Sequence, residues 1–324
     1  MKYLVVTCIA VLACACGTPA SQSNQGIAVG TVDARFGAIP SPRFSPESNT
    51  APEAAAAGPG QSYGGLVTLT WTGHLDYSMQ AAPVSRYAEP TAHDANAFAS
   101  SLGANPEVNG NRQIVGYGTP DFELKVDGTT PTPTDPRPAS PPTFFIFPSA
   151  TLRPTVPAGT SVADFAAQYL AQHGLTPQWP YTVEVEGSAV LFLRQVAVPG
   201  YASPTHVIDS GGRYSGLEVD FTGDELVRVV GPLPIGLDST SYPIIPADQA
   251  VRAALASSPP PAAGEAARPT VQLTSAELVY ALAPGGKGGY YEPALLFSGT
   301  FKVQGTTFVK LVLVPLVDPS LRSS

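Results

Sequence analysis

The chain has 324 residues, 44% of them hydrophobic, and this length predicts about two domains with a sizeable core. Charged residues make up only 13% of the chain, and 25 acidic residues against 17 basic ones give a formal net charge of −8. Binding to nucleic acid needs clustered cations, so the scattered basic residues argue against a nucleic-acid partner. An acidic surface is not attracted to anionic lipid, so membrane attachment needs another anchor.

Residues 1–16 have the layout of a lipoprotein signal peptide, with Lys2 ahead of an apolar run over residues 3–12. This run is too short to cross a bilayer, which takes about 20 helical residues. A cysteine after a small residue resembles the lipobox of bacterial lipoproteins, whose cysteine is acylated and becomes the new amino terminus. We expect lipidation at Cys16, with Cys14 as the alternative, and therefore a protein that is secreted and lipid-anchored on the outer face of the cell membrane.

The other interpretation of this start is an ordinary cleaved signal with incidental cysteines. In either case at most one further cysteine survives processing, because the chain has only three. No disulfide can then join parts of the mature protein, so its fold must depend on its core.

Residues 17–62 are rich in Pro, Ala, Ser and Gly and hold almost no large apolar side chain. Such a segment cannot bury enough surface to offset its ordering entropy, so the sequence predicts a disordered tether. As a flexible coil it would hold the folded part about 35 to 40 Å from the anchor on average. Two further proline-rich stretches, 129–143 and 257–270, are expected to be loops or linkers.

Three segments have the apolar spacing of a short amphipathic helix. They are TAHDANAFASSLG from Thr91, SVADFAAQYLAQHG from Ser161, and PADQAVRAAL from Pro246. Asp94 and Asp164 stand three residues after the first residue of their segments, which is the spacing of a capping box. Each of the first two segments ends in a glycine, at the position where a helix would stop.

Alternating apolar patterns follow each helix and predict antiparallel strands, joined by hairpin turns at TGDE (222–225) and APGGKGG (283–289). Short helices packed on antiparallel strands make an α+β fold. We expect repeated units of a short helix on an antiparallel sheet, at 63–148, 149–237 and 238–319.

The order of these patterns resembles a known family. Residues 160–316 contain GRYSGLEVDFTGDELVRVVGPL, SYPIIPADQAVRAAL, SAELVYAL and YYEPALLFSGTF. In this order they look like secreted PepSY-like proteins related to the YycH and YycI regulators of bacterial two-component systems. The chain is also similar to uncharacterised lipoproteins of high-GC Gram-positive bacteria. The resemblance implies a PepSY-like unit at the C-terminal end and a non-enzymatic protein that acts by protein contact.

No catalytic, cofactor-binding or metal-binding residue is predicted. The sequence has no G-x-S-x-G, and its glycine run PGGKGGYY lacks the ending of a phosphate-binding loop. None of the four histidines has a histidine three or four residues away, so no helical metal site is predicted; they are His74, His93, His173 and His206.

Two acidic pairs have an ordinary interpretation. Glu184 and Glu186 alternate with valines, so both carboxylates should lie on the open face of a strand. Asp224 and Glu225 fall in a predicted turn. We expect both pairs to be solvated.

Aromatic residues near predicted strand starts offer a weaker possibility, an exposed ring cluster that receives a peptide, a glycan or a partner protein. They are Trp179, Tyr181, Tyr290 and Tyr291. Core packing is the ordinary role for each.

The leading hypothesis is a lipid-anchored extracytoplasmic interaction protein that contacts a membrane or envelope protein, such as a sensor kinase. The alternative is a lipoprotein that binds a small ligand or a cell-wall fragment. A third hypothesis is a hydrolase whose site joins residues such as His206, Asp209 and Ser215.

Overall fold

The computed structural model describes residues 32–46, 61–62, 66–75, 77–88, 90–108, 114–129, 141–258, 261, 264, 268–285 and 288–323. Within these residues it contains seventeen strands and three α-helices. The predicted signal peptide, Cys14 and Cys16 lie outside them. No helix in the described ranges has both the length and the apolar composition needed to span a bilayer.

All three predicted helices are confirmed: α1 (Ala92–Ser101), α2 (Val162–Gln172) and α3 (Ala247–Ala256). Thr91 and Asp94 form the capping box of α1, because each side chain accepts a hydrogen bond from the other's backbone N–H. The hydroxyl of Ser161 accepts from the backbone N–H of Asp164 at the start of α2.

The strands cover most of the remaining described chain. They are β1 (Gln61–Ser62), β2 (Thr68–Trp71), β3 (Ala81–Ala88), β4 (Asn105–Val108), β5 (Ile114–Gly118), β6 (Phe122–Asp127), β7 (Thr143–Pro148), β8 (Tyr181–Glu186), β9 (Ala189–Val196), β10 (Thr205–Ile208), β11 (Gly216–Thr222), β12 (Glu225–Pro232), β13 (Leu237–Pro243), β14 (Thr270–Leu273), β15 (Ser275–Gly285), β16 (Gly288–Val303) and β17 (Thr306–Pro315).

Fifteen strands join in one mixed sheet, whose main path runs β1-β17-β16-β15-β10-β9-β11-β12-β7-β6-β5-β4. β13 pairs with β3, β3 also pairs with β16, and β8 pairs with β9. β2 and β14 form a separate parallel pair. Two predicted hairpins are confirmed: β11 and β12 meet at Thr222↔Glu225, and β15 and β16 meet at Gly285↔Gly288.

The prediction of an α+β fold made of repeated helix-on-sheet units is wrong, because the described chain is mainly β with one large mixed sheet. Backbone pairing crosses the boundaries expected between units. β10 pairs in parallel with β15 through His206↔Val279, and β3 pairs with β13 through Val84↔Thr240. α3 buries only Ala250 and Ala254, so it covers little of the sheet.

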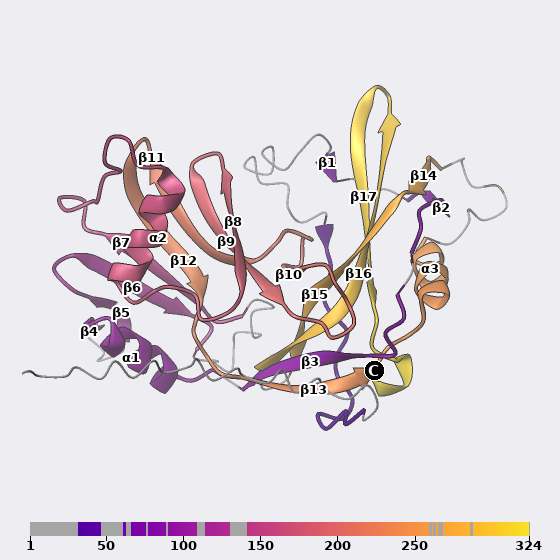
Figure 1. The fold of residues 1–324 in the computed structure, drawn as a ribbon, viewed down its shortest axis with the longest axis horizontal. Helices are drawn as coiled ribbons and strands as arrows, with labels where there is room; N and C mark the ends of the chain where they lie inside the picture. Colours follow the sequence, from indigo (N-terminus) through magenta and orange to yellow (C-terminus); the bar gives the residue numbers. More distant parts are fainter. Residues whose placement is uncertain are drawn as a thin grey trace, which may run out of the picture. The chain divides into compact units, whose positions relative to one another are not determined.

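Two main hydrophobic clusters stabilise the fold. The first lies between α1, α2 and the strands β5, β6, β7, β9, β11 and β12, and the second joins α3, β2 and β14 to β15, β16 and β17 (Figure 1). Their central side chains are fully or almost fully buried: Leu124, Ile146, Val190, Val219 and Val229 in the first, and Leu273, Leu278, Tyr280 and Phe297 in the second.

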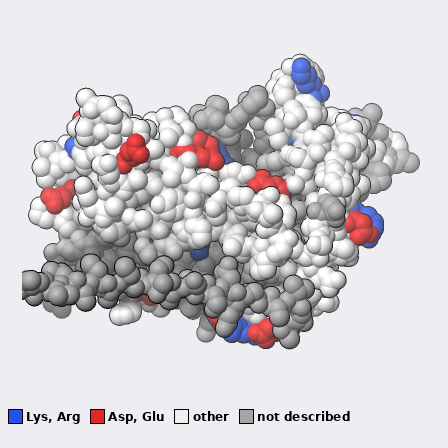
Figure 2. All heavy atoms as spheres, viewed as in Figure 1, with Lys and Arg blue, Asp and Glu red and all other residues white. Residues whose placement is uncertain are grey.

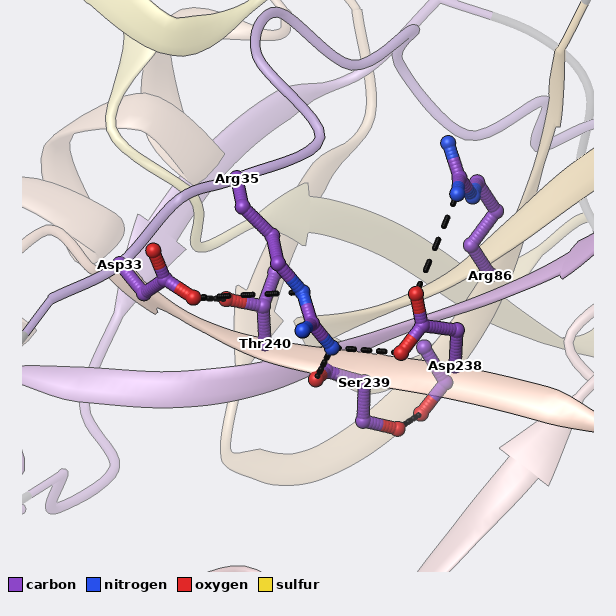
Figure 3. Close-up of polar contacts among 7 residues, drawn as sticks. Asp33, Arg35, Arg86, Asp238, Ser239 and Thr240 are labelled. Atoms are coloured by element: carbon purple, nitrogen blue, oxygen red, sulfur yellow. Dashed lines mark hydrogen bonds and ion pairs between the residues drawn. The ribbon is translucent and has the colours of Figure 1, made fainter.

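Residues 32–46 fall within the stretch predicted to be a disordered tether, yet they pack against the sheet. Ile39 is completely buried. Arg35 Nη2 lies 2.5 Å from Asp238 Oδ1, and the Thr240 hydroxyl donates to Asp33 Oδ2 over 3.2 Å (Figure 3). This part of the predicted tether is therefore ordered, and we refer to residues 32–46 as the strap.

Candidate interaction surface

The strand β8 lies at an edge of the sheet. It pairs with β9 in antiparallel register from Tyr181↔Arg194 to Glu186↔Ala189, and the two strands are neighbours in one hairpin (Figure 1). Among the described strands β8 has no second partner. An edge strand carries a row of backbone N–H and C=O groups that can pair with another chain.

Hydrogen bonds of β9 identify which residues of β8 present these groups. The N–H of Arg194 donates to Ser215 O over 2.9 Å, on the side of β9 away from β8. The next N–H, of Gln195, donates to Pro180 O over 2.8 Å, toward β8. Because backbone groups alternate along antiparallel strands, residues 181, 183 and 185 direct their N–H and C=O away from β9.

The same three residues expose apolar side chains. Tyr181, Val183 and Val185 retain 36%, 43% and 52% of their accessible surface, and we call them the β8 row. They share one face of the strand, since side chains alternate with period two. Natural edge strands usually avoid combining free backbone groups with apolar side chains. β8 therefore has the features of a site that pairs with another chain.

The opposite face of β8 is acidic. Glu184 and Glu186 are both exposed, which confirms the predicted solvated strand face. Nearby, Glu277 accepts hydrogen bonds from the Tyr214 hydroxyl at 3.0 Å and 2.8 Å. Burial, Glu277 and Glu184 together raise the pKa of Tyr214. The back of the strand therefore favours a cationic neighbour.

Arg194 lies at one end of the β8 row, directly opposite Tyr181 on β9. Its guanidinium carbon lies 5.6 Å from the ring centroid of Trp179 and 5.1 Å from that of Tyr291, within the range of cation–π contacts. The rings of Trp179 and Tyr181 meet edge to face at 6.1 Å. The structure thus brings three of the four predicted aromatic residues together, whereas Tyr290 packs 6.0 Å from Phe36 of the strap.

Arg194 differs from six other described arginines in its partners. It is half-buried, and burial lowers its pKa, while an electrostatic interaction and a hydrogen bond with Tyr291 act in the opposite direction. Among the described residues it forms no ion pair, whereas six other arginines do: Arg35, Arg86, Arg153, Arg228, Arg252 and Arg322. Arg194 was not among the predicted candidates, although a cation inside the apolar strand AVLFLRQVAV was a usable signal.

Two residues of the hypothetical site at His206, Asp209 and Ser215 have other partners. His206 Nε2 lies 3.3 Å from the Thr182 hydroxyl, and its ring packs 4.5 Å from that of Tyr214. Asp209 Oδ1 accepts from two backbone N–H groups of the following turn. No hydrogen bond or ion pair joins the side chain of His206 to that of Asp209 or Ser215 among the described residues.

The remaining predicted polar residues occupy ordinary places. Glu225 pairs with Arg153 at 3.5 Å, beside an exposed Asp224. The ring of His173, at the end of α2, packs 4.3 Å from that of Tyr169. In the part of the chain that the structure describes, no three His, Cys, Asp or Glu side chains are grouped to hold a metal ion.

The visible surface is sparsely charged. Figure 2 shows lysine, arginine and acidic side chains as small separate patches on a largely uncharged face. Long-range steering of a charged partner needs a coherent field. Contacts at this surface would therefore rely mainly on apolar burial and backbone hydrogen bonds, with local charges setting the register.

No protein-family model matches the chain, and no curated protein sequence matches it. Among solved structures, it is similar to an uncharacterized protein from Eubacterium rectale ATCC 33656, with 7% sequence identity and a TM-score of 0.30. The match covers 76% of this chain and 87% of that one.

Proposed function

We propose that this is a lipid-anchored, extracytoplasmic and non-enzymatic interaction protein that binds an extended segment of a partner protein along β8. The observation that carries the proposal is the coincidence on one strand of free backbone groups and an exposed apolar row. In this mode of recognition, main-chain hydrogen bonds supply affinity and alternate side chains supply specificity. The expected partner is a membrane or envelope protein, such as a sensor.

The charges around β8 define the chemistry of the partner segment. A strand added beside β8 would place alternate side chains next to Glu184 and Glu186, and the others next to the β8 row. Opposite charges and apolar pairs across strands each contribute about 0.2 to 1 kcal/mol. The partner segment should therefore alternate lysine or arginine with β-branched or aromatic residues.

A designed peptide tests this binding mode. The probe is acetyl-Lys-Val-Lys-Val-Thr-Val-amide, written to run antiparallel to β8 from Glu186 to Tyr181. Titration with amide-proton detection by NMR should shift and protect the N–H groups of Tyr181, Val183 and Val185. Val183→Pro removes one outward donor without touching the pairing with β9, so it should abolish binding in a folded protein.

Side-chain variants provide the matched control. Val108 is an exposed valine of β4, which pairs with β5 alone in the described chain, and it retains 61% of its surface. Val185→Lys should weaken the probe several-fold, because it replaces an apolar contact and adds a charge, whereas Val108→Lys should leave binding unchanged. Equal effects of the two variants, or protection of amides elsewhere than β8, would refute strand addition.

The lipid anchor is tested separately. The intact mass of mature protein extracted from membranes should show an acyl-modified cysteine as its first residue. Cys16→Ala should release the protein from membranes, and persistence of the acylated form would shift the assignment to Cys14. An unmodified protein in the soluble fraction would contradict the anchor while leaving the β8 site untouched.

A lipoprotein that binds a small ligand or a cell-wall fragment remains the second candidate. One observation favours it: the half-buried Arg194 between Trp179 and Tyr291. Under this hypothesis a small anionic ligand would bind at Arg194. It would not compete with a peptide for the β8 backbone, and Val183→Pro would leave its binding unchanged.

A further inference from the structure

Arg194 has no carboxylate partner among the described residues, and strand addition alone gives it no role. A charge that is taken out of water is ordinarily compensated by a counter-charge or by several hydrogen bonds. Within the described residues, Arg194 has two aromatic rings and an interaction with the Tyr291 hydroxyl, but no carboxylate. Arg322 is also half-buried and has its carboxylate, Glu292, at 2.6 Å.

The aromatic rings around Arg194 pack against further rings. Tyr291 and Tyr87 are only 6% and 5% exposed, and their rings pack 6.1 Å apart. Trp179 is fixed on the other side by its edge-to-face contact with Tyr181. A guanidinium held in this way has lost much of its rotamer freedom before any ligand arrives, which reduces the entropy cost of forming a bidentate contact.

The position of Arg194 relates it to the β8 edge. Arg194 and Tyr181 are directly opposite each other, and their backbone groups point away from one another, so their side chains are neighbours on one face. Tyr181 is the first residue of β8. A segment added antiparallel to β8 therefore finishes its pairing at Tyr181. Arg194 lies at the same end of the hairpin, on β9, across β8 from the added segment.

We propose that Arg194 binds the C-terminal carboxylate of a segment added antiparallel to β8. The ligand class is a free carboxyl terminus preceded by alternating basic and apolar residues. Arginine and carboxylate match in planar, bidentate geometry, and a terminal carboxylate supplies the counter-charge that the chain itself does not provide. This inference rests on the proposed strand addition.

The test compares two forms of one probe. Acetyl-Lys-Val-Lys-Val-Thr-Val is titrated with a free carboxyl terminus and with a terminal amide. We expect the free acid to bind the wild-type protein about tenfold more tightly, the effect of one charge-assisted hydrogen-bonded pair. In Arg194→Met the two forms should bind equally, with an affinity close to that of the amide for the wild type.

Control variants separate a direct contact from loss of structure. Arg194→Lys keeps the charge but not the fork of donors, so it should retain only part of the preference for the free acid. Arg213→Met removes an exposed arginine outside β8 and β9 and should retain all of it. A thermal unfolding curve of each variant shows that the fold is intact.

Each alternative result has a distinct meaning. Equal binding of acid and amide by the wild type, with both lost in Val183→Pro, would overturn the carboxylate contact and leave strand addition standing. A preference for the acid that persists in Arg194→Met would also overturn it. Failure of both forms to bind would overturn strand addition and with it this inference. N-acetylvaline binding as tightly as the free-acid peptide would show a site for small carboxylates independent of β8.

Discussion

Arg322 forms a bidentate ion pair with Glu292, a glutamate of β16 whose side chain is completely buried. Its two terminal nitrogens donate to the two carboxylate oxygens over 3.1 Å and 2.6 Å. Burial raises the pKa of Glu292, and Arg322 acts against this rise. The backbone of Arg322 also forms a parallel bridge with Ile39, so this pair fixes the last described residues and the strap to the sheet.

Arg322→Met should destabilise the protein strongly, because it leaves a buried carboxylate without a partner. Removing one member of a buried pair costs about 3 to 5 kcal/mol in free energy of unfolding, measured by urea denaturation. The double variant Arg322→Met with Glu292→Leu should recover most of this loss. A single variant as stable as the wild type would mean that Glu292 is compensated by other groups.

Ile39→Ala should destabilise the strap more than Arg35→Ala does. Truncation of a fully buried isoleucine costs about 2 to 5 kcal/mol, whereas exposed ion pairs such as that of Arg35 and Asp238 contribute about 0 to 1 kcal/mol. Hydrogen exchange followed by mass spectrometry should therefore show faster exchange of residues 32–46 in Ile39→Ala alone. The reverse order would indicate that charge, not burial, fixes the strap.

Stability should fall as the pH rises through neutrality, owing to Glu218 on β11. Burial is the main cause that raises its pKa to about 7, and the neighbouring Asp220 adds to it, while Arg228 opposes both. The protonated carboxyl is favoured in the folded state, so its contribution is complete below the ordinary glutamate pKa and is lost as the pH passes the folded value.

The measurement is the free energy of unfolding of wild type and Glu218→Gln between pH 5 and pH 8. The wild type should lose stability relative to the variant over this interval. Because the Glu218 side chain is 36% exposed, solvent screening makes the effect smaller than the full shift implies. Parallel curves for the two proteins would contradict the raised pKa.

Proline substitutions should confirm which backbone groups of β8 are free. Thr182 lies between two residues with outward N–H groups, so its own N–H points to β9, and Thr182→Pro should remove a ladder hydrogen bond and cost about 1 to 3 kcal/mol. Val183→Pro should change stability by about 1 kcal/mol or less. Thermal or urea unfolding of both variants checks this order, and equal losses would mean that the register of β8 is shifted.

Local patterns predicted individual elements well. Thr91 with Asp94 and Ser161 with Asp164 located two helix starts, and the residues between Thr222 and Glu225 located a hairpin. These features depend on side chains three or four residues apart, which sequence spacing reports directly.

Pairing between strands that lie far apart in the sequence could not be predicted. His206 pairs with Val279, 73 positions later, and no local period specifies that these strands become neighbours. The same limit applies to the surface. Tyr181 and Trp179 were predicted as candidates from the sequence. The contact of Arg194 with Tyr291 could not be predicted, because it forms only when β16 lies beside Arg194.

With a lipid on Cys16, the packed strap would limit how far the folded part of the chain can lie from a membrane. If Cys16 carries the lipid, only fifteen residues separate it from residue 32, the first residue of the strap. Even fully extended, a segment of this length spans roughly 55 Å. Residue 32 would then stay within this distance of the bilayer, which favours carboxyl termini displayed near the membrane as partners over those presented far out in the cell wall.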